Sequence, residues 1–191
     1  MPNWCSTNYR IVGEKESLEK VKKMITELDS MKEPSVENGF GKLWLGCIVD
    51  YLGGDWHSVH CRGCIESYEF DDNEIRLCLE VAWAESPDFR HFLEDEIPGI
   101  KIYQYSEEFG CAGCWTNDPD YPWQYYLDSC FSEIESEYFK SLEDAASYLQ
   151  EHGIECKLTD DYKTLSEAVR KYSEEHEDEY LNLYEVEFVN D

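Results

Sequence analysis

The most restrictive feature of the sequence is an alternating pattern between residues 75 and 83. Apolar side chains occupy every second position there: Ile75, Leu77, Leu79, Val81 and Trp83. This period is typical of a strand with one buried face. Residues 64–70 form a second strand candidate, and Asp71-Asp72-Asn73 between the two is a turn sequence. The pattern therefore predicts a β-hairpin whose apolar face must be covered by another layer.

Candidate helices and strands on both sides of this hairpin complete a recognisable order. Residues 4–12 read as a strand, followed by a helix that we expect Ser17 to cap. Ser86 with Pro87 at the first helical position predicts a second helix, and residues 100–105 predict a fourth strand. The resulting order, β-α-β-β-α-β, is that of the ferredoxin-like α+β fold with an antiparallel sheet. Residues 33–60 are an insertion with one helical turn expected around 43–51.

The remainder of the chain predicts a smaller acidic α+β extension packed on the core. We expect a strand at 121–127, a helix from Ser141 to Gly153, a helix at the capping box Thr164 to Glu167, and a strand at 180–189. The predicted division is a core at residues 1–115 and an extension at residues 116–191.

The cysteines and the start of the chain bear on where the protein resides. Neither a secretory signal pattern nor a run of roughly 18 apolar residues is present, so we expect a protein that is neither secreted nor inserted in a membrane. Nine cysteines, an odd number, fit reduced thiols or metal ligands better than a set of disulfides. The sequence thus predicts a cytoplasmic location.

The charge of the chain is strongly negative and unevenly distributed. The formal net charge is −27, which argues against direct binding to nucleic acid or anionic lipid, because phosphates are bound by Lys and Arg. Residues 1–60 contain 9 acidic and 7 basic side chains, whereas residues 61–191 contain 34 acidic and 9 basic. We therefore expect a one-sided negative field that would attract a basic protein, including one that handles nucleic acid.

Several short motifs resemble a known family. They are Met1-Pro2-Asn3-Trp4 before a short strand, the turn from Val81-Ala82-Trp83 into a proline-containing helix, and Tyr105, Glu107, Glu108 and Gly110 after the fourth strand. Over roughly residues 1–130 the chain resembles the YubB-type ferredoxin-like domain proteins of plasmids, phages and bacterial genomes. The resemblance implies the fold and an intracellular setting, and it supplies no catalytic residues. The chain departs from the family pattern at Cys111-Ala112-Gly113-Cys114.

Two Cys-x-x-Cys pairs are candidate zinc ligands: Cys61 with Cys64, and Cys111 with Cys114. Two such pairs can complete a tetrahedral site. In the expected fold both pairs lie at one end of the sheet, together with Cys5, His57 and His60, but on opposite edge strands. The alternative is that these are small, partly buried thiols. Neither pair precedes a clear helix, which argues against thioredoxin-like redox chemistry.

No familiar catalytic motif is present, so the sequence indicates no catalytic residues and leaves enzymatic activity uncertain. The chain lacks a Gly-x-Ser-x-Gly elbow, a phosphate-binding loop and a His-Glu-x-x-His helix. Gly53-Gly54-Asp55 beside Trp56 and His57 could shape a pocket, although such a turn is common in ordinary loops. An enzyme that uses the loop from Gly53 to His60 is the least favoured of three hypotheses.

The favoured hypothesis is a binding protein, and the second is a zinc-stabilised structural module. A dense aromatic segment could supply a docking surface through Trp115 and Trp123, or its rings could fill the seam between core and extension. An acidic run near the C-terminus could attract a basic partner. Its members are Glu174, Glu175, Glu177, Asp178 and Glu179.

Overall fold

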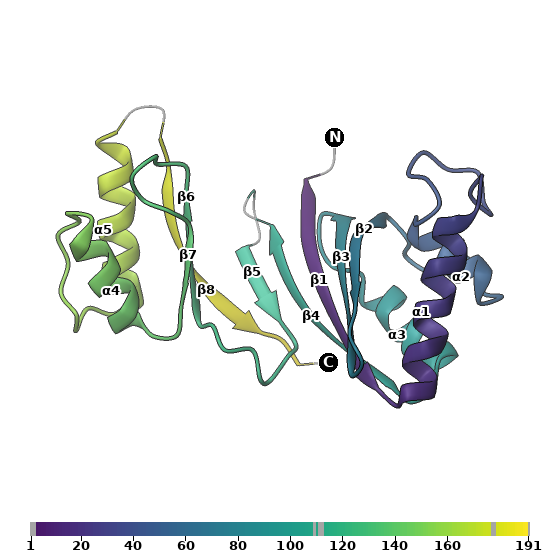
Figure 1. Cartoon of the computed structure of the whole chain (residues 1–191). Coiled ribbons are helices and arrows are strands. Elements are labelled where there is room, and N and C mark those ends of the chain that lie inside the picture. Colours follow the sequence, from purple (N-terminus) through teal and green to yellow (C-terminus); the bar gives the residue numbers. More distant parts are fainter. Residues whose placement is uncertain (1–2, 109, 111–112, 177–178, 191) are drawn as a thin grey trace. The chain divides into compact units, whose positions relative to one another are not determined.

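The computed structural model describes residues 3–108, 110, 113–176 and 179–190 (Figure 1). The chain divides into two compact units, Met1–Ala112 and Gly113–Asp191. This division falls slightly before the boundary predicted at residue 115, because a strand already begins at Gly113. In the described part of the chain, no helix is long and apolar enough to cross a membrane.

The first unit contains a four-stranded antiparallel sheet and three helices. Its strands are β1 (Trp4–Gly13), β2 (Gly63–Phe70), β3 (Glu74–Ala82) and β4 (Ile100–Glu108), and its helices are α1 (Lys15–Ser30), α2 (Leu45–Tyr51) and α3 (Pro87–Glu96). The strands lie in the order β2-β3-β1-β4. All three pairings are antiparallel. Figure 1 shows the helices on one side of this sheet.

The alternation of apolar residues decides which face of the first sheet the helices cover. Leu77, Leu79 and Val81 of β3 are buried, as are Tyr9 and Ile11 of β1, which pair with Leu77 and Ile75. The apolar stripe of α1 and the rings of α3 complete this core. The hairpin prediction is confirmed, and the chain is a mixed α+β protein.

The segment between α1 and β2 contributes to the core instead of only forming an external loop. Its helix α2 buries Leu45, Cys47, Ile48 and Val49 almost completely. The helical turn expected around 43–51 is therefore confirmed and belongs to the first core. The backbone next to it is tied to β2, because the Ile65 N–H donates a 3.0 Å hydrogen bond to the Leu43 carbonyl.

The second unit contains four strands and two helices in its described residues. They are β5 (Gly113–Thr116), β6 (Tyr125–Ser129), β7 (Glu137–Phe139), α4 (Leu142–Glu151), α5 (Tyr162–Glu174) and β8 (Leu181–Phe188). The strand order is β5-β8-β6-β7, with β5 parallel to β8 and the other two pairs antiparallel. Leu149 of α4 and Leu165 and Val169 of α5 pack in its core.

Several predicted element ends and caps differ from the structure. Helix α1 begins at Lys15, and the Ser17 hydroxyl donates to the Pro98 carbonyl instead of capping the helix. Helix α5 is capped by Asp161, whose carboxylate accepts from the Thr164 N–H at 2.9 Å. The strand expected at 121–127 begins at Tyr125 rather than at residue 121. Strands β5 and β7 were not predicted, because each has four residues or fewer.

Candidate functional site

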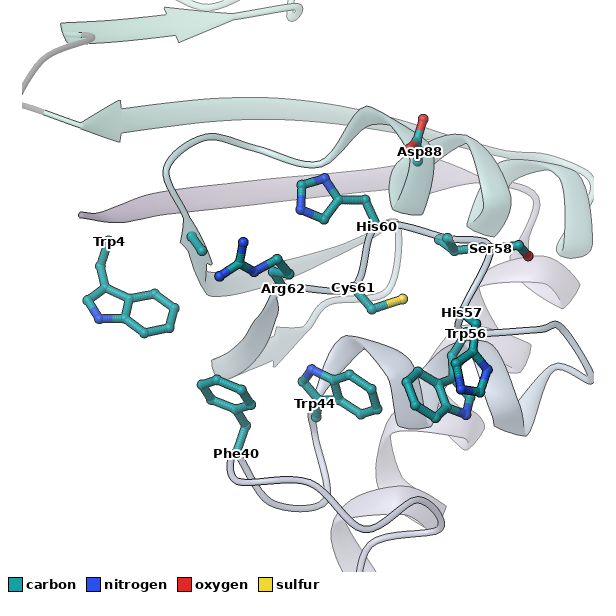
Figure 2. A pocket seen from close by; sticks show the side chains of 12 residues that line it. Trp4, Phe40, Trp44, Trp56, His57, Ser58, His60, Cys61, Arg62 and Asp88 are labelled. Carbon is teal, nitrogen blue, oxygen red and sulfur yellow. The ribbon is translucent and has the colours of Figure 1, made fainter. Parts of the chain in front are cut away.

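A cleft lies at the end of the first sheet where β1 begins, β3 ends and β2 begins (Figure 2). Its volume is about 760 Å³, which is within the range of pockets that bind small molecules. Every lining residue belongs to the first unit. Figure 2 shows the rings of Trp4, Phe40, Trp44 and Trp56 along one side, with Arg62 between them and His60.

One row across three strands forms part of the cleft wall. Trp4 of β1 pairs with Ala82 of β3, and the Ala82 N–H donates a 2.8 Å hydrogen bond to the Arg62 carbonyl just before β2. Residues that face each other across antiparallel strands project to the same face of the sheet. A small alanine thus lies between two long side chains, which leaves a hollow above Ala82.

The segment between α1 and β2 supplies the remaining rings. Asn38 shapes the turn that presents Phe40, because its Oδ1 accepts from the Phe40 and Gly41 N–H groups at 2.6 and 2.9 Å. Trp44 is fixed by a backbone bridge to Cys64. A Cβ at Gly46 would lie 2.1 Å from the Trp44 ring, so this close approach requires glycine.

The aromatic rings form two contacting pairs, and part of their surface stays open to solvent. Trp4 and Phe40 meet edge to face with centroids 6.0 Å apart, and Trp44 and Trp56 do so at 5.2 Å. Trp4 remains 42% exposed and Phe40 49% exposed. Exposed rings that are already held in place can contact a ligand at low entropic cost.

The two histidines of the cleft are held in different ways, His57 through its ring and His60 through its backbone. His57 stacks on Trp56 at 3.7 Å, and its Nδ1 lies 2.9 Å from Asp55 Oδ1. Hydrogen bonds from the backbone N–H and the ring of His57 lower the pKa of Asp55, so this carboxyl stays ionised. His60 is tied through its carbonyl, which accepts a 2.6 Å hydrogen bond from the Ser86 hydroxyl.

The predicted zinc ligands fall into different surroundings. Cys61 lines the cleft, whereas the Cys64 thiol donates a 3.0 Å hydrogen bond to Glu66 Oε1. Burial raises the pKa of each of these two thiols to about 12. Cys114 belongs to the second unit, where its thiol donates to the Glu185 carbonyl, and Cys111 lies outside the described residues.

The described residues contain no group of three or more His, Cys, Asp or Glu side chains arranged to hold a metal ion. A thiol must lose its proton to bind zinc, and the raised pKa of Cys61 and Cys64 opposes this loss. Zinc binding by Cys61, Cys64, Cys111 and Cys114 remains a prediction.

Three of the predicted interaction residues of the second unit, Trp123, Glu174 and Glu175, contact identified partners. The Trp123 ring packs against the Tyr138 ring in a tilted arrangement, with centroids 6.2 Å apart, and the Lys140 ammonium lies 5.4 Å from the Trp123 ring centre. Trp115 is half-buried on β5. Glu174 and Glu175 form ion pairs one helical turn away, with Arg170 and Lys171 at 2.8 and 3.9 Å. Glu179 is half-buried, and Glu177 and Asp178 lie outside the described residues.

Sequence reasoning located only part of the cleft. The loop from Gly53 to His60, which includes Trp56 and His57, was recognised as a possible pocket. Trp4, Ala82 and Arg62 were missed as lining residues. The chain was also compared with known proteins, and no family model, curated protein or solved structure matches it.

Proposed function

We propose that this protein is a binding protein and that the aromatic cleft of the first unit is its binding site. The supporting observation is that four aromatic rings, one from β1 and three from the segment between α1 and β2, line one cleft. Part of the surface of Trp4 and Phe40 stays open to solvent, so these rings can contact a ligand. Such a cleft suits recognition of a small molecule with an apolar part.

The six tryptophans offer a direct test, because each indole N–H gives its own resonance in an NMR spectrum of the ¹⁵N-labelled full chain. Small aromatic compounds should shift the resonances of Trp4, Trp44 and Trp56. The resonances of Trp115 and Trp123 in the second unit serve as the internal control. A screen in which no compound shifts the cleft resonances, or in which Trp115 and Trp123 shift instead, would exclude the cleft as the binding site.

A second candidate function is electrostatic capture of a basic protein, including one that handles nucleic acid. It is supported by the charge of the second unit, which contains 21 acidic and 5 basic side chains. Glu133, Glu135 and Glu143 are exposed, and in the described part of the chain no cation lies within ion-pair distance of them. These carboxylates favour association with Lys and Arg of a partner.

We also propose a ferredoxin-like fold for the first unit and membership of the YubB-type family. The support for the fold is the element order together with the strand order β2-β3-β1-β4. Helix α2 is an addition between the first helix and the second strand of that pattern. The family proposal rests on the short motifs described above.

A further inference from the structure

The charge of one side chain indicates which ligands the cleft would select. The chain has five arginines, and four of them contact a carboxylate or a ring. Arg76, Arg90 and Arg170 pair with glutamates, and Arg10 lies over the Tyr103 ring. Arg62 is exposed in the cleft, and no described carboxylate or aromatic ring lies within interaction distance of its guanidinium.

An arginine without a carboxylate partner is unexpected in a protein with a net charge of −27. Arg76 and Arg170 pair with surface carboxylates, whereas the side chains that line the cleft around Arg62 are largely aromatic. Asp88 also lines the cleft, and Figure 2 shows its carboxyl pointing away from Arg62. The positive charge of Arg62 is therefore available to a ligand.

We infer that the cleft binds a planar, ring-containing molecule that carries a carboxylate or a phosphate. This inference rests on the binding function proposed above. The rings of Trp4, Phe40 and Trp44 would contact the planar part by stacking, and the Arg62 guanidinium would form two parallel hydrogen bonds to the anion. The volume of about 760 Å³ accommodates a molecule of this size.

The alternatives fit the cleft less well. Aromatic rings alone would favour a cationic ligand, because a cation is attracted to a ring face. Arg62 lies among these rings and would repel such a ligand. A neutral ligand would cover the guanidinium without supplying an acceptor of opposite charge, and burial of an unpaired charge is unfavourable. A planar anion can stack on the aromatic rings and pair with the Arg62 guanidinium.

The test is a titration of the ¹⁵N-labelled full chain with two matched sets of ligands. The carboxylate set contains indole-3-acetate, neutral tryptophol and cationic tryptamine, which share the indole ring. The phosphate set contains adenosine monophosphate and adenosine. We expect at least one anion to bind about tenfold more tightly than its neutral partner, as a charge-assisted hydrogen bond provides, and tryptamine to bind least. If only one set shows this difference in affinity between anion and neutral compound, that set tells whether the cleft prefers a carboxylate or a phosphate.

Variants of Arg62 test whether this side chain causes the difference in affinity between the anionic and the neutral compound. Arg62→Gln should reduce the anion's affinity to that of the neutral compound, and Arg62→Lys should restore part of it, because lysine keeps the charge without the bidentate geometry. Arg76→Gln is the matched control, since Arg76 is an exposed arginine of the same sheet. Unchanged backbone amide resonances of β4, which belongs to the first unit but does not line the cleft, would show that each variant remains folded.

The outcomes separate this inference from the proposed function. If neutral compounds shift the cleft resonances as strongly as the anions, the cleft is a binding site but the anion preference is wrong. The same holds if Arg62→Gln binds the anions as well as the unaltered chain does. If no compound of either set shifts these resonances, whereas the wider aromatic screen does, the inference fails and the binding function stands. If the screen fails as well, both are wrong.

Discussion

At the scale of single residues, a buried ion pair connects the end of β3 with α3. The Glu85 and Arg90 side chains are 3% and 1% exposed, and Arg90 Nε lies 3.0 Å from Glu85 Oε1. The Tyr9 hydroxyl donates a 2.7 Å hydrogen bond to the same carboxylate oxygen. Burial, followed by the charge of Glu85, raises the pKa of Tyr9, so this tyrosine remains a hydrogen-bond donor. The pair therefore links the helix-covered face of β1 to α3.

Replacing Glu85 by Gln should destabilise the fold by about 3–5 kcal/mol, because the carboxylate that neutralises the buried Arg90 is lost. Urea denaturation followed by circular dichroism measures this loss. Glu174→Gln is the control, since Glu174 belongs to an exposed pair with Arg170 and its replacement should cost about 0–1 kcal/mol. Equal effects of the two substitutions would show that the buried pair does not stabilise the fold more than a surface pair.

At the scale of elements, strand β2 begins between two buried thiols. The pKa of Cys61 and of Cys64 is raised from 9.0 to about 12, chiefly by burial. Burial also raises the pKa of Tyr184, on β8, to about 12. Each of these groups binds its proton more tightly in the folded chain than in the unfolded one. Their contribution to stability is therefore fully present below pH 9 and is lost as the pH rises toward 12.

We expect the urea midpoint of the reduced protein to fall steadily from about pH 9 to about pH 11, because the unfolded chain releases protons that the folded chain retains. Circular dichroism at several pH values measures the midpoint. Cys64→Ala removes one of the titrating thiols and should make the decline shallower. A midpoint that stays constant over this range would contradict the assigned pKa shifts.

The elements themselves were largely predictable, because their signals are local. The alternation in β3 and the Ser86 cap with Pro87 both appear in the structure as expected. Ser17 was misassigned because its hydroxyl contacts Pro98, which is distant in sequence. The short strands β5 and β7 depend on pairing with distant neighbours, so local patterns do not mark them.

The cleft was harder to predict, because one irregularity in β2 changes the register. Counting pairs outward from the hairpin turn, beginning at Phe70 opposite Ile75, would place Arg62 opposite Trp83. The register shifts between Ile65 and Ser67, and Arg62 instead lies opposite Ala82. A shift by one residue moves side chains to the other face of a sheet. The pattern of residue types alone does not locate this bulge.

At the scale of the whole molecule, the negative charge is concentrated in Gly113–Asp191. Some carboxylates of this unit already pair with cations, whereas others are open to a basic partner. Glu174 and Glu175 are paired with cations on α5. Glu133, Glu135 and Glu143 are exposed in the segments around β7 and α4, and none of them forms an ion pair with another described residue. A basic partner would gain more from the unpaired carboxylates, since no existing ion pair must be broken.

An oligolysine peptide should associate with the full chain at a rate that falls steeply as salt increases. Neutralising Glu133, Glu135 and Glu143 together to Gln should weaken binding by on the order of 1 kcal/mol. Glu174→Gln with Glu175→Gln is the comparison and should have a smaller effect. Surface plasmon resonance at several salt concentrations measures both. Binding that is insensitive to salt, or more sensitive to the α5 pair, would contradict electrostatic capture by the unpaired carboxylates.

The burial of α2 has a consequence for how fast ligands would enter and leave the cleft. Trp44 immediately precedes this helix, whose apolar residues belong to the same core as α1 and α3. The wall of the cleft is therefore anchored before any ligand arrives, and no segment has to fold around it. Association with a preformed site of this kind has similar rates for related ligands. Differences in affinity among them would then be differences in residence time.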